Sequence, residues 1–127
     1  MRWSDADAAN MPQAFAEHFA AEWIKVWNSR DLTAILKHYA EDVVFHSPRI
    51  AVVMDQPTAF VAGKEALARY WGKALSQSKD LRFELDRVYV GRDSLTIAYR
   101  NQRGQHVAET FTFNAEGVVK ESIATYA

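Results

Sequence analysis

The chain has 127 residues, of which 49% are hydrophobic and 24% charged, with a net charge of −1 and no cysteine. This length and composition predict one globular domain and exclude disulfides and thiolate chemistry. Charges of both signs are interspersed without a basic stripe, and no apolar run approaches the ~20 residues of a membrane span, so we expect neither a nucleic-acid nor a membrane partner.

The first ten residues are polar and acidic, which predicts a loose tail and, without a secretory signal, a cytoplasmic location. Asn10 is the predicted N-cap of a helix over residues 11–28. Aromatic and aliphatic residues recur at helical spacing on one face of this helix: Phe15, Phe19, Trp23, Val26 and Trp27.

Asp31 is the predicted cap of a second helix that ends near Ala40. Its apolar stripe consists of Leu32, Ile35, Leu36 and Tyr39. A short strand over 43–46 follows, and Pro48 ends it. Residues 47–63 are irregular yet apolar, and they fit a lid, a dimer contact or a short hairpin strand. A third helix is predicted from Lys64 to about residue 76, with an inner face of Leu67, Tyr70, Trp71, Ala74 and Leu75.

From Leu81 onward the apolar period changes to two, and glycine-containing turns separate strands of similar length, which predicts an antiparallel meander of four strands. A change of phase within the first of these strands predicts a β-bulge near Asp86–Arg87.

The register of the meander follows from its turns. A three-residue turn over 103–105 brings the apolar faces of its flanking strands together. It predicts Tyr99 opposite Glu109, Ile97 opposite Phe111 and Leu95 opposite Phe113. The same reasoning at the next turn places Ile123 opposite Glu109.

Several stretches of the chain resemble nuclear transport factor 2-like and SnoaL-like domains over residues 12–126. They are the run over 27–32, the run over 38–45, the helix after Gly63 and the ending over 113–119. The resemblance implies a single α+β domain over 1–127, a cone in which three N-terminal helices pack on a strongly bent antiparallel sheet and enclose a pocket. The superfamily includes isomerases, cyclases, dehydratases, epoxide hydrolases and non-enzymatic binding domains, so the fold alone does not decide the activity.

Ketosteroid isomerase, a member of that superfamily, can be compared position by position. Its general-base carboxylate falls on Ser47, its oxyanion-binding tyrosine on Trp23, and its protonated acid on Glu109. Serine is not a base unaided, and an indole offers only a donor. We therefore expect that this chain does not run that isomerisation in the usual way.

Two residues are candidates for acid–base chemistry. Glu109 lies among apolar neighbours on the predicted inner face, where it acts as a pocket acid with a raised pKa, pairs with a cation such as Arg49 or Arg100, or hydrogen-bonds Tyr99. His46 is either a general acid–base or a structural or interface histidine, and strand alternation lets only one of His46 and Ser47 face inward.

The candidate ligand-binding residues are mostly aromatic, and each is equally compatible with a plain core. They are Trp23, Trp27, Phe45, Phe60, Tyr70, Trp71, Phe83, Tyr99, Asn101 and Phe111. Asn101 either binds a ligand or caps the turn. We expect no metal and no cofactor, because the chain lacks paired histidine spacing, cysteine and a glycine-rich phosphate loop.

These observations predict a pocket for a small apolar or aromatic molecule, in a cofactor-independent isomerase, cyclase or lyase that uses Glu109 with help from His46. The alternative is a non-catalytic binding or dimerisation domain. The resemblance also implies a homodimer formed through the sheets. The outward residues expected at that contact are small or hydroxylated: Thr96, Ala98, Thr110, Thr112, Ser122 and Ala124.

Overall fold

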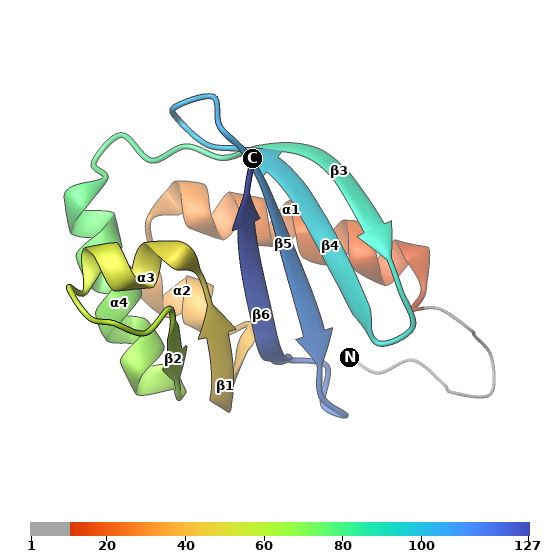
Figure 1. The fold of residues 1–127 in the computed structure, drawn as a ribbon. Coiled ribbons are helices and arrows are strands. Elements are labelled where there is room, and N and C mark those ends of the chain that lie inside the picture. The colour runs from red at the N-terminus through yellow and green to blue at the C-terminus, as the bar shows by residue number, and fades with distance from the viewer. Residues whose placement is uncertain (1–10) are drawn as a thin grey trace.

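The computed structural model describes residues 11–127, in which four helices pack on a six-stranded sheet (Figure 1). The helices are α1 (Gln13–Ser29), α2 (Leu32–Leu36), α3 (Pro48–Val53) and α4 (Lys64–Gln77). The strands are β1 (Tyr39–His46), β2 (Phe60–Ala62), β3 (Glu84–Val90), β4 (Ser94–Arg100), β5 (His106–Phe113) and β6 (Val119–Tyr126). The predicted tail and the Asn10 cap lie outside the described residues.

The sheet has the order β2-β1-β6-β5-β4-β3, and β1 pairs with β6 in parallel while the other pairs are antiparallel. The expectation of a purely antiparallel, strongly bent sheet is therefore wrong: the sheet is mixed and not strongly curled (Figure 1). Because β1 and β2 extend the sheet beyond the meander, α4 can pack on them and close the inner face from the side. Helices, rather than curl, provide that wall.

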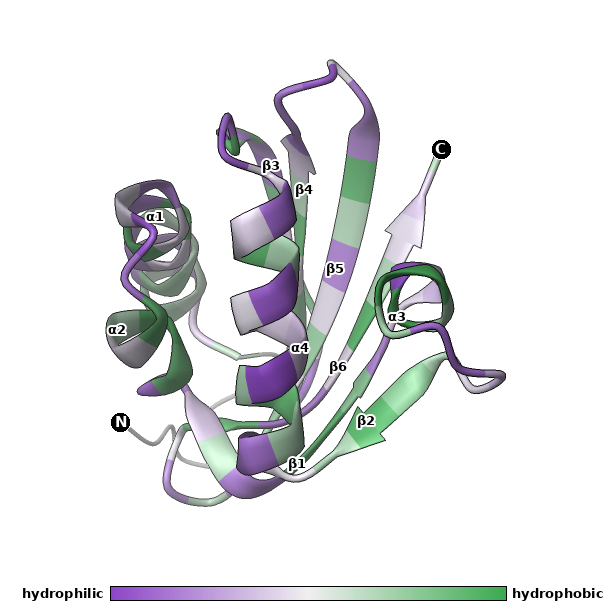
Figure 2. Cartoon of the chain, turned by 90° about the vertical axis from the view of Figure 1, so that its left-hand side faces the viewer, coloured by the Kyte–Doolittle hydropathy of each residue, from purple (hydrophilic) through white to green (hydrophobic). Residues whose placement is uncertain are grey.

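The predicted apolar stripes of the two long helices are confirmed. Phe19, Trp23 and Trp27 of α1 are buried, as are Tyr70 and Trp71 of α4. Figure 2 shows the polar surfaces of both helices turned away from the sheet. The aromatic residues meet above the sheet: the Trp27 and Trp71 rings pack edge to face at 4.9 Å between centroids. Large aromatic side chains in such contacts contribute strongly to the stability of the core.

The corner after α1 ties three parts of the fold together. The Asn28 side chain donates to the carbonyl oxygen of Phe83 at 2.9 Å and accepts from its backbone N–H at 2.7 Å. Arg30 ends α1 in the left-handed conformation, with a φ of 63°, and its guanidinium donates to the carbonyl oxygens of Leu75 and Ser78 at the end of α4. The predicted cap of α2 is confirmed, because the Asp31 carboxylate accepts from the N–H of Ala34.

The second helix is shorter than predicted. It ends at Leu36, and Tyr39 and Ala40 begin β1, where Tyr39 pairs with Val119 of β6. Tyr39 falls at helical spacing in the sequence, but it belongs to a strand. Its ring is buried, and its hydroxyl accepts a hydrogen bond from the Trp23 indole. Tertiary pairing with a distant strand overrides the local periodicity here.

The segment over 47–63 contains two elements. The strand alternative is confirmed by β2, which pairs antiparallel with β1 as a hairpin. The helix α3 was not predicted, although the sequence carries its signal. Ser47 is an N-cap whose side chain accepts from the N–H of Arg49, and Pro48 occupies the first turn, where its missing N–H costs nothing.

The turn between β4 and β5 corrects the predicted register by two residues. Glu109 lies opposite Ile97, Phe111 opposite Leu95 and Val107 opposite Tyr99. The turn spans five residues instead of three, because the Asn101 side chain accepts from two backbone N–H groups within it. Three and five are both odd, so the inner face was predicted correctly although the partners were not.

The faces of β6 are the reverse of the prediction. A register shift between Thr112 and Phe113 places Ala124, rather than Ile123, opposite Glu109. Ser122 and Ala124 are therefore buried on the inner face and do not belong to the expected outward set, whereas Ile123 is 43% exposed. A bulge adds one residue to one strand and inverts every side chain beyond it. The bulge predicted in β3 is present between Leu85 and Arg87.

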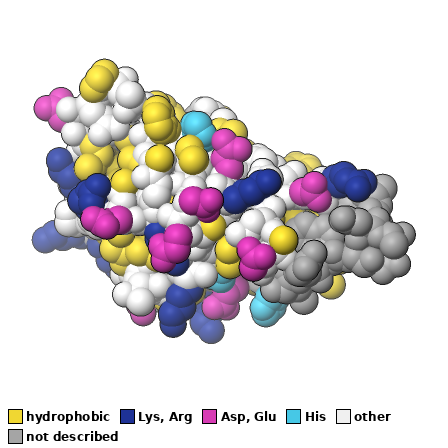
Figure 3. All heavy atoms as spheres, turned by 90° about the horizontal axis from the view of Figure 1, so that it is seen from below, with side chains coloured by type: hydrophobic (Ala, Val, Ile, Leu, Met, Phe, Trp, Pro, Cys, Tyr) yellow, Lys and Arg dark blue, Asp and Glu magenta, His cyan; other side chains and the backbone are white. Residues whose placement is uncertain are grey.

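No helix in the described part of the chain is long and apolar enough to cross a membrane. Figure 3 shows acidic and basic side chains intermingled on the face seen from below, with apolar side chains gathered toward the end where β2 and α3 lie. Val52 and Phe60 are among the exposed apolar side chains of the chain.

We predict that replacing Asn28 by Ala lowers the free energy of unfolding by about 1–3 kcal/mol, because both backbone groups of Phe83 lose their partner. Denaturant titration measures the change. Asn28→Asp, which keeps one acceptor, should fall between the wild type and Asn28→Ala. The exposed substitution Gln13→Ala is the control, and an equal effect of both alanine variants would contradict the role of Asn28.

Candidate functional site

A cavity of about 90 Å³, open to solvent, lies between the inner face of the sheet and helices α1 and α4. Lining residues that stay in contact with solvent mark its opening, and they include Ser78 after α4, Arg49 of α3, Gln102 and Arg103 of the β4–β5 turn, and Tyr126 at the end of β6. These segments meet at the same end of the molecule (Figure 1). The volume is below the ~150 Å³ of a cavity that holds benzene, so the interior admits a small group or one end of a molecule.

Most of the sequence-predicted site residues line this cavity. Seven are aromatic and come from both long helices, from β1, from β4 and from the segment before β3: Trp23, Trp27, Phe45, Tyr70, Trp71, Phe83 and Tyr99. Glu109 and Asn101 line it as well. The Asn101 side chain, however, is occupied by the hydrogen bonds of its own turn, so of the two predicted roles the structure favours the turn cap.

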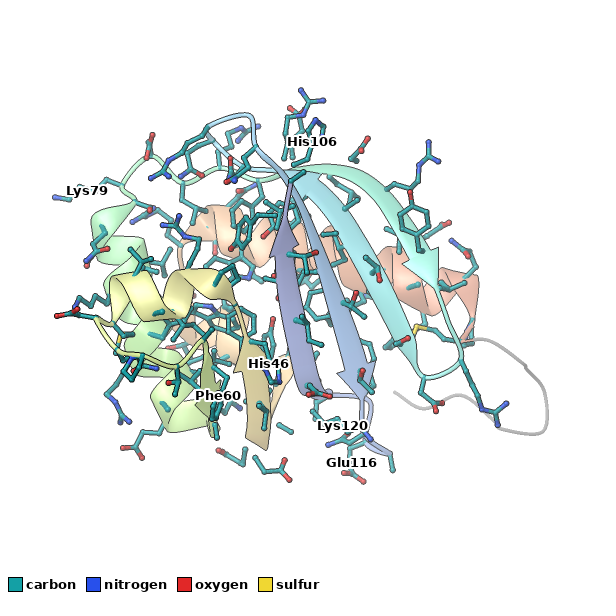
Figure 4. All side chains as sticks on the ribbon, viewed as in Figure 1. His46, Phe60, Lys79, His106, Glu116 and Lys120 are labelled. Atoms are coloured by element: carbon teal, nitrogen blue, oxygen red, sulfur yellow. The ribbon has the colours of Figure 1, made fainter. Side chains whose placement is uncertain are left out.

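Three predicted residues lie elsewhere. Phe111 is fully buried beneath the cavity against Phe19 and Trp23. Phe60 and His46 lie on neighbouring strands at the outer face of the sheet, with their rings 6.1 Å apart (Figure 4). Sequence alternation had left open which of His46 and Ser47 faces inward, and it is Ser47.

His46 is thereby separated from Glu109 by the sheet itself. Its Nε2 atom lies 3.0 Å from a carboxylate oxygen of Glu121, and both side chains are partly exposed. A histidine on the outer face does not reach a molecule held among the inner side chains. The expectation that His46 assists Glu109 is not supported by this position.

Glu109 is the charged residue at the base of the cavity. It projects from β5 between Val107 and Phe111, and it is only 3% exposed. Ser122 of β6 donates a hydrogen bond to its Oε2 atom at 2.8 Å. No cation among residues 11–127 forms an ion pair with it. Of the alternatives that the sequence left open, the structure shows an unpaired acid.

Burial raises the pKa of Glu109 from its usual value of 4.5 to about 7, and the Ser122 hydrogen bond opposes this only in part. Removing a carboxylate from water disfavours its charged form, which is the physical cause of the shift. The direction of this shift agrees with the raised pKa that the sequence predicted. At neutral pH the carboxyl group exists in both protonation states, so it can both donate and accept a proton.

Tyrosine hydroxyl groups surround this carboxyl group. Burial raises the pKa of Tyr39 and of Tyr99 well above the usual value, and the nearby Glu109 charge adds to both shifts. Burial also raises the pKa of Tyr70 and Tyr126, while hydrogen bonding to Ser47 opposes this. These hydroxyl groups therefore stay neutral and remain available as hydrogen-bond donors.

Ser47 stands at the position where ketosteroid isomerase has its base. Its side chain is buried, and its oxygen already accepts from the N–H of Arg49 as the cap of α3. A serine engaged in this way does not supply the missing carboxylate. This geometry agrees with the expectation that the usual isomerisation is not run here.

Two buried polar atoms beside the cavity have no hydrogen-bond partner in the described part of the chain. They are the indole Nε1 of Trp27 and the amide Oε1 of Gln102. An unsatisfied buried donor is costly, so such groups often await a ligand or a water molecule. Within residues 11–127 no group of three His, Asp or Glu side chains is arranged to hold a metal ion.

Sequence reasoning missed Arg49, Gln102, Arg103 and Tyr126 as lining residues. Arg49 was considered only as a possible cation partner of Glu109, because α3 was not predicted, although the Ser47-Pro48 start signal would have placed it in a first turn. Tyr126 was hidden because the bulge between β5 and β6 inverts the strand faces. Gln102 and Arg103 sit in a turn whose length no periodicity reveals.

Comparison with known proteins identifies the family. Residues 20–121 match the SnoaL-like domain, so the chain belongs to that family and has the nuclear transport factor 2-like fold. No curated protein matches the sequence.

Three solved structures are similar. A SnoaL-like protein of unknown function from Burkholderia thailandensis is 40% identical with a TM-score of 0.88, covering 93% of this chain and 98% of its own. A nuclear transport factor 2-like protein of unknown function from Mesorhizobium loti is 21% identical, with a TM-score of 0.63 and coverages of 92% and 97%. The epoxide hydrolase/cyclase-like enzyme SalBIII, which acts in pyran ring formation in the polyether salinomycin, is 16% identical, with a TM-score of 0.69 and coverages of 91% and 92%.

The raised pKa of Glu109 predicts how stability depends on pH. The folded chain keeps the proton up to about pH 7, while the unfolded chain loses it near pH 4.3, so the wild type loses stability as the pH rises between these values. The loss amounts to roughly 3–4 kcal/mol at 1.36 kcal/mol for each pH unit. Glu109→Gln does not titrate, so its stability relative to the wild type should rise between pH 5 and pH 8, with the smaller difference at pH 5.

Denaturant midpoints of both proteins at pH 5 and pH 8 measure this difference. Glu41→Gln removes a carboxylate from the exposed surface and should show no such pH-dependent gain. If Glu109→Gln is instead less stable than the wild type at pH 8, Glu109 is held as a paired anion and the assignment of a neutral acid is wrong.

Proposed function

We propose that the chain binds a small, largely apolar molecule in this cavity and uses Glu109 as a pocket acid toward an oxygen atom of that molecule. The chemistry that fits is a cofactor-independent isomerisation, cyclisation or lyase step. The observation that carries the proposal is a fully buried, unpaired carboxyl group, with a pKa of about 7, facing an open cavity.

Aromatic side chains suit the walls of such a site. Trp23, Trp27 and Trp71 exclude water on the helix side, and Tyr99 and Phe83 stack at 4.5 Å between centroids on the sheet side. In an apolar surrounding, a hydrogen bond from a neutral acid to a carbonyl oxygen stabilises negative charge that develops there. One carboxyl group that titrates near neutrality can then return the proton in a later step.

SalBIII, which acts in pyran ring formation, has a similar fold. At 16% identity the comparison supports the fold and not the activity. The acid–base assignment here therefore rests on Glu109 and its surroundings. His46 has no part in the proposed step, because it lies on the outer face.

A neutral ketone series tests the proposal. We expect acetone, 2-butanone or 2-pentanone to bind about tenfold more tightly at pH 6 than at pH 8, because protonated Glu109 donates to the carbonyl oxygen and its pKa is about 7. Titration of the indole N–H signals by nuclear magnetic resonance measures the affinity, since three of the four tryptophans line the cavity.

Variants of Glu109 distinguish the effect of its hydrogen bond to the ligand from the effect of side-chain size. Glu109→Gln keeps a donor and should bind equally at both pH values, while Glu109→Leu should bind weakly at both. Glu41→Gln should behave like the wild type. Binding that is independent of pH in the wild type, or a Glu109→Leu variant that binds as tightly, would remove Glu109 from the site.

A second role, dimerisation, has its own observation on the outer face. One register row crosses all six strands and consists of Phe60, His46, Ile123, Thr110, Thr96 and Tyr89. The row carries no carboxylate or lysine, and its ends are apolar and exposed. We propose that this row meets the same row of a second copy, since an isologous contact needs a self-complementary patch.

We predict that the wild type has twice the chain mass in multi-angle light scattering and that Ile123→Lys has the mass of one chain. A lysine at the middle of the contact would leave two charges buried and unpaired. Val52→Lys, an exposed substitution on α3, is the matched control and should stay dimeric. A wild type with the mass of one chain at micromolar concentration would contradict the contact.

A further inference from the structure

The mouth of the cavity carries positive charge. Among the described lining residues, the charged side chains are Arg49, Arg103 and Glu109. Arg49 comes from the first turn of α3, and Arg103 from the β4–β5 turn, so two different elements each contribute one arginine to the lining. The carboxyl group lies deep on the sheet instead.

Neither guanidinium group has an ion pair within the described residues. The charged contacts there join Arg69 to Glu65 and, when the histidine is protonated, His46 to Glu121. Arg49 is half-buried beside the hydroxyl groups of Tyr70 and Tyr126, where its charge favours their ionised forms. A half-buried arginine without a carboxylate partner is the residue type that recognises a ligand anion with paired, charge-assisted hydrogen bonds.

The interior offers a second, independent observation. The Trp27 indole is only 5% exposed, lines the cavity and donates to no described group. An indole N–H is a donor only, so its missing partner is an acceptor. Together with the Glu109 carboxyl group, it defines a place for an uncharged oxygen atom inside the cavity.

We propose that the natural ligand is a small carboxylic acid with a carbonyl group at its far end: the carboxylate lies at the mouth between Arg49 and Arg103, and the carbonyl oxygen lies inside, near Trp27 and Glu109. This inference rests on the proposed function and names the substrate class of the same site. The small volume, about 90 Å³, agrees with a ligand of which only one end enters the interior.

A ligand carboxylate is more favourable at the mouth of the cavity than in its interior. A carboxylate placed at the interior would face a second carboxyl group and lose its hydration among aromatic rings, which is unfavourable. At the mouth it keeps part of its water and gains two guanidinium partners. The orientation of the molecule, carbonyl inward, follows from this difference.

Methyl-ketone acids of increasing length test the proposal: 2-oxopropanoate, 4-oxopentanoate and 6-oxoheptanoate, each beside its neutral amide. We expect at least one acid to bind at least tenfold more tightly than its amide in isothermal titration calorimetry. Arg49→Gln and Arg103→Gln should each weaken the acid about tenfold and leave the amide unchanged. Arg92→Gln, in the exposed turn between β3 and β4, is the control.

The outcomes separate this inference from the proposed function. If an acid and its amide bind equally, or if the arginine variants leave the acid unchanged, the carboxylate assignment is wrong while the pocket acid stands. If no acid, no amide and no neutral ketone binds at millimolar concentration, both are wrong. The Trp27 indole N–H signal should shift with every bound member, and a bound acid that leaves it unmoved would place the ligand elsewhere.

Discussion

The bonds at the corner after helix α1 fix where the walls of the cavity stand. Asn28 holds both backbone groups of Phe83, and Arg30 holds the last carbonyl oxygens of α4. The same helix end therefore positions the approach to β3 and the end of α4, which lie on two sides of the opening. Because these partners are backbone groups, the arrangement is independent of the side chains that line the cavity, and those can vary without loss of the frame.

Within that frame, the sheet separates two environments. On the inner face, aromatic packing removes water from Glu109, and the desolvation raises its pKa to about 7. On the outer face, the side chains of His46 and Glu121 keep contact with water and lie 3.0 Å apart, within hydrogen-bond distance. Neighbouring positions at the end of β1 thus have unlike surroundings: Ser47 is buried on the inner side, while His46 lies on the outer face. Successive side chains of a strand point to opposite faces of the sheet. A residue with suitable chemistry can therefore act in the site only if it lies on the inner face.

At Glu109 the stability of the fold and the proposed function make opposite demands. A glutamine there would keep an acceptor for Ser122 without a charge at neutral pH, whereas an acid without a cation beside it is costly. Buried polar groups of this kind occur where a fold carries a function, and the unpartnered Trp27 donor beside the same cavity is a second instance. The fold is that of the family, and the buried acid Glu109 and the unpartnered Trp27 donor are the features that support a ligand site in it.

The sequence by itself determined the apolar faces of α1 and α4, the bulge in β3 and the inward orientation of Glu109, because each depends on a local period of 3.6 or 2 that only nearby residues set. The tertiary structure alone decided the parallel pairing of β1 with β6, the bulge that turns Ser122 inward to bond Glu109, and the placement of Arg49 and Tyr126 at the mouth. Those features depend on which distant segments meet and on a single inserted residue, and no local period records either.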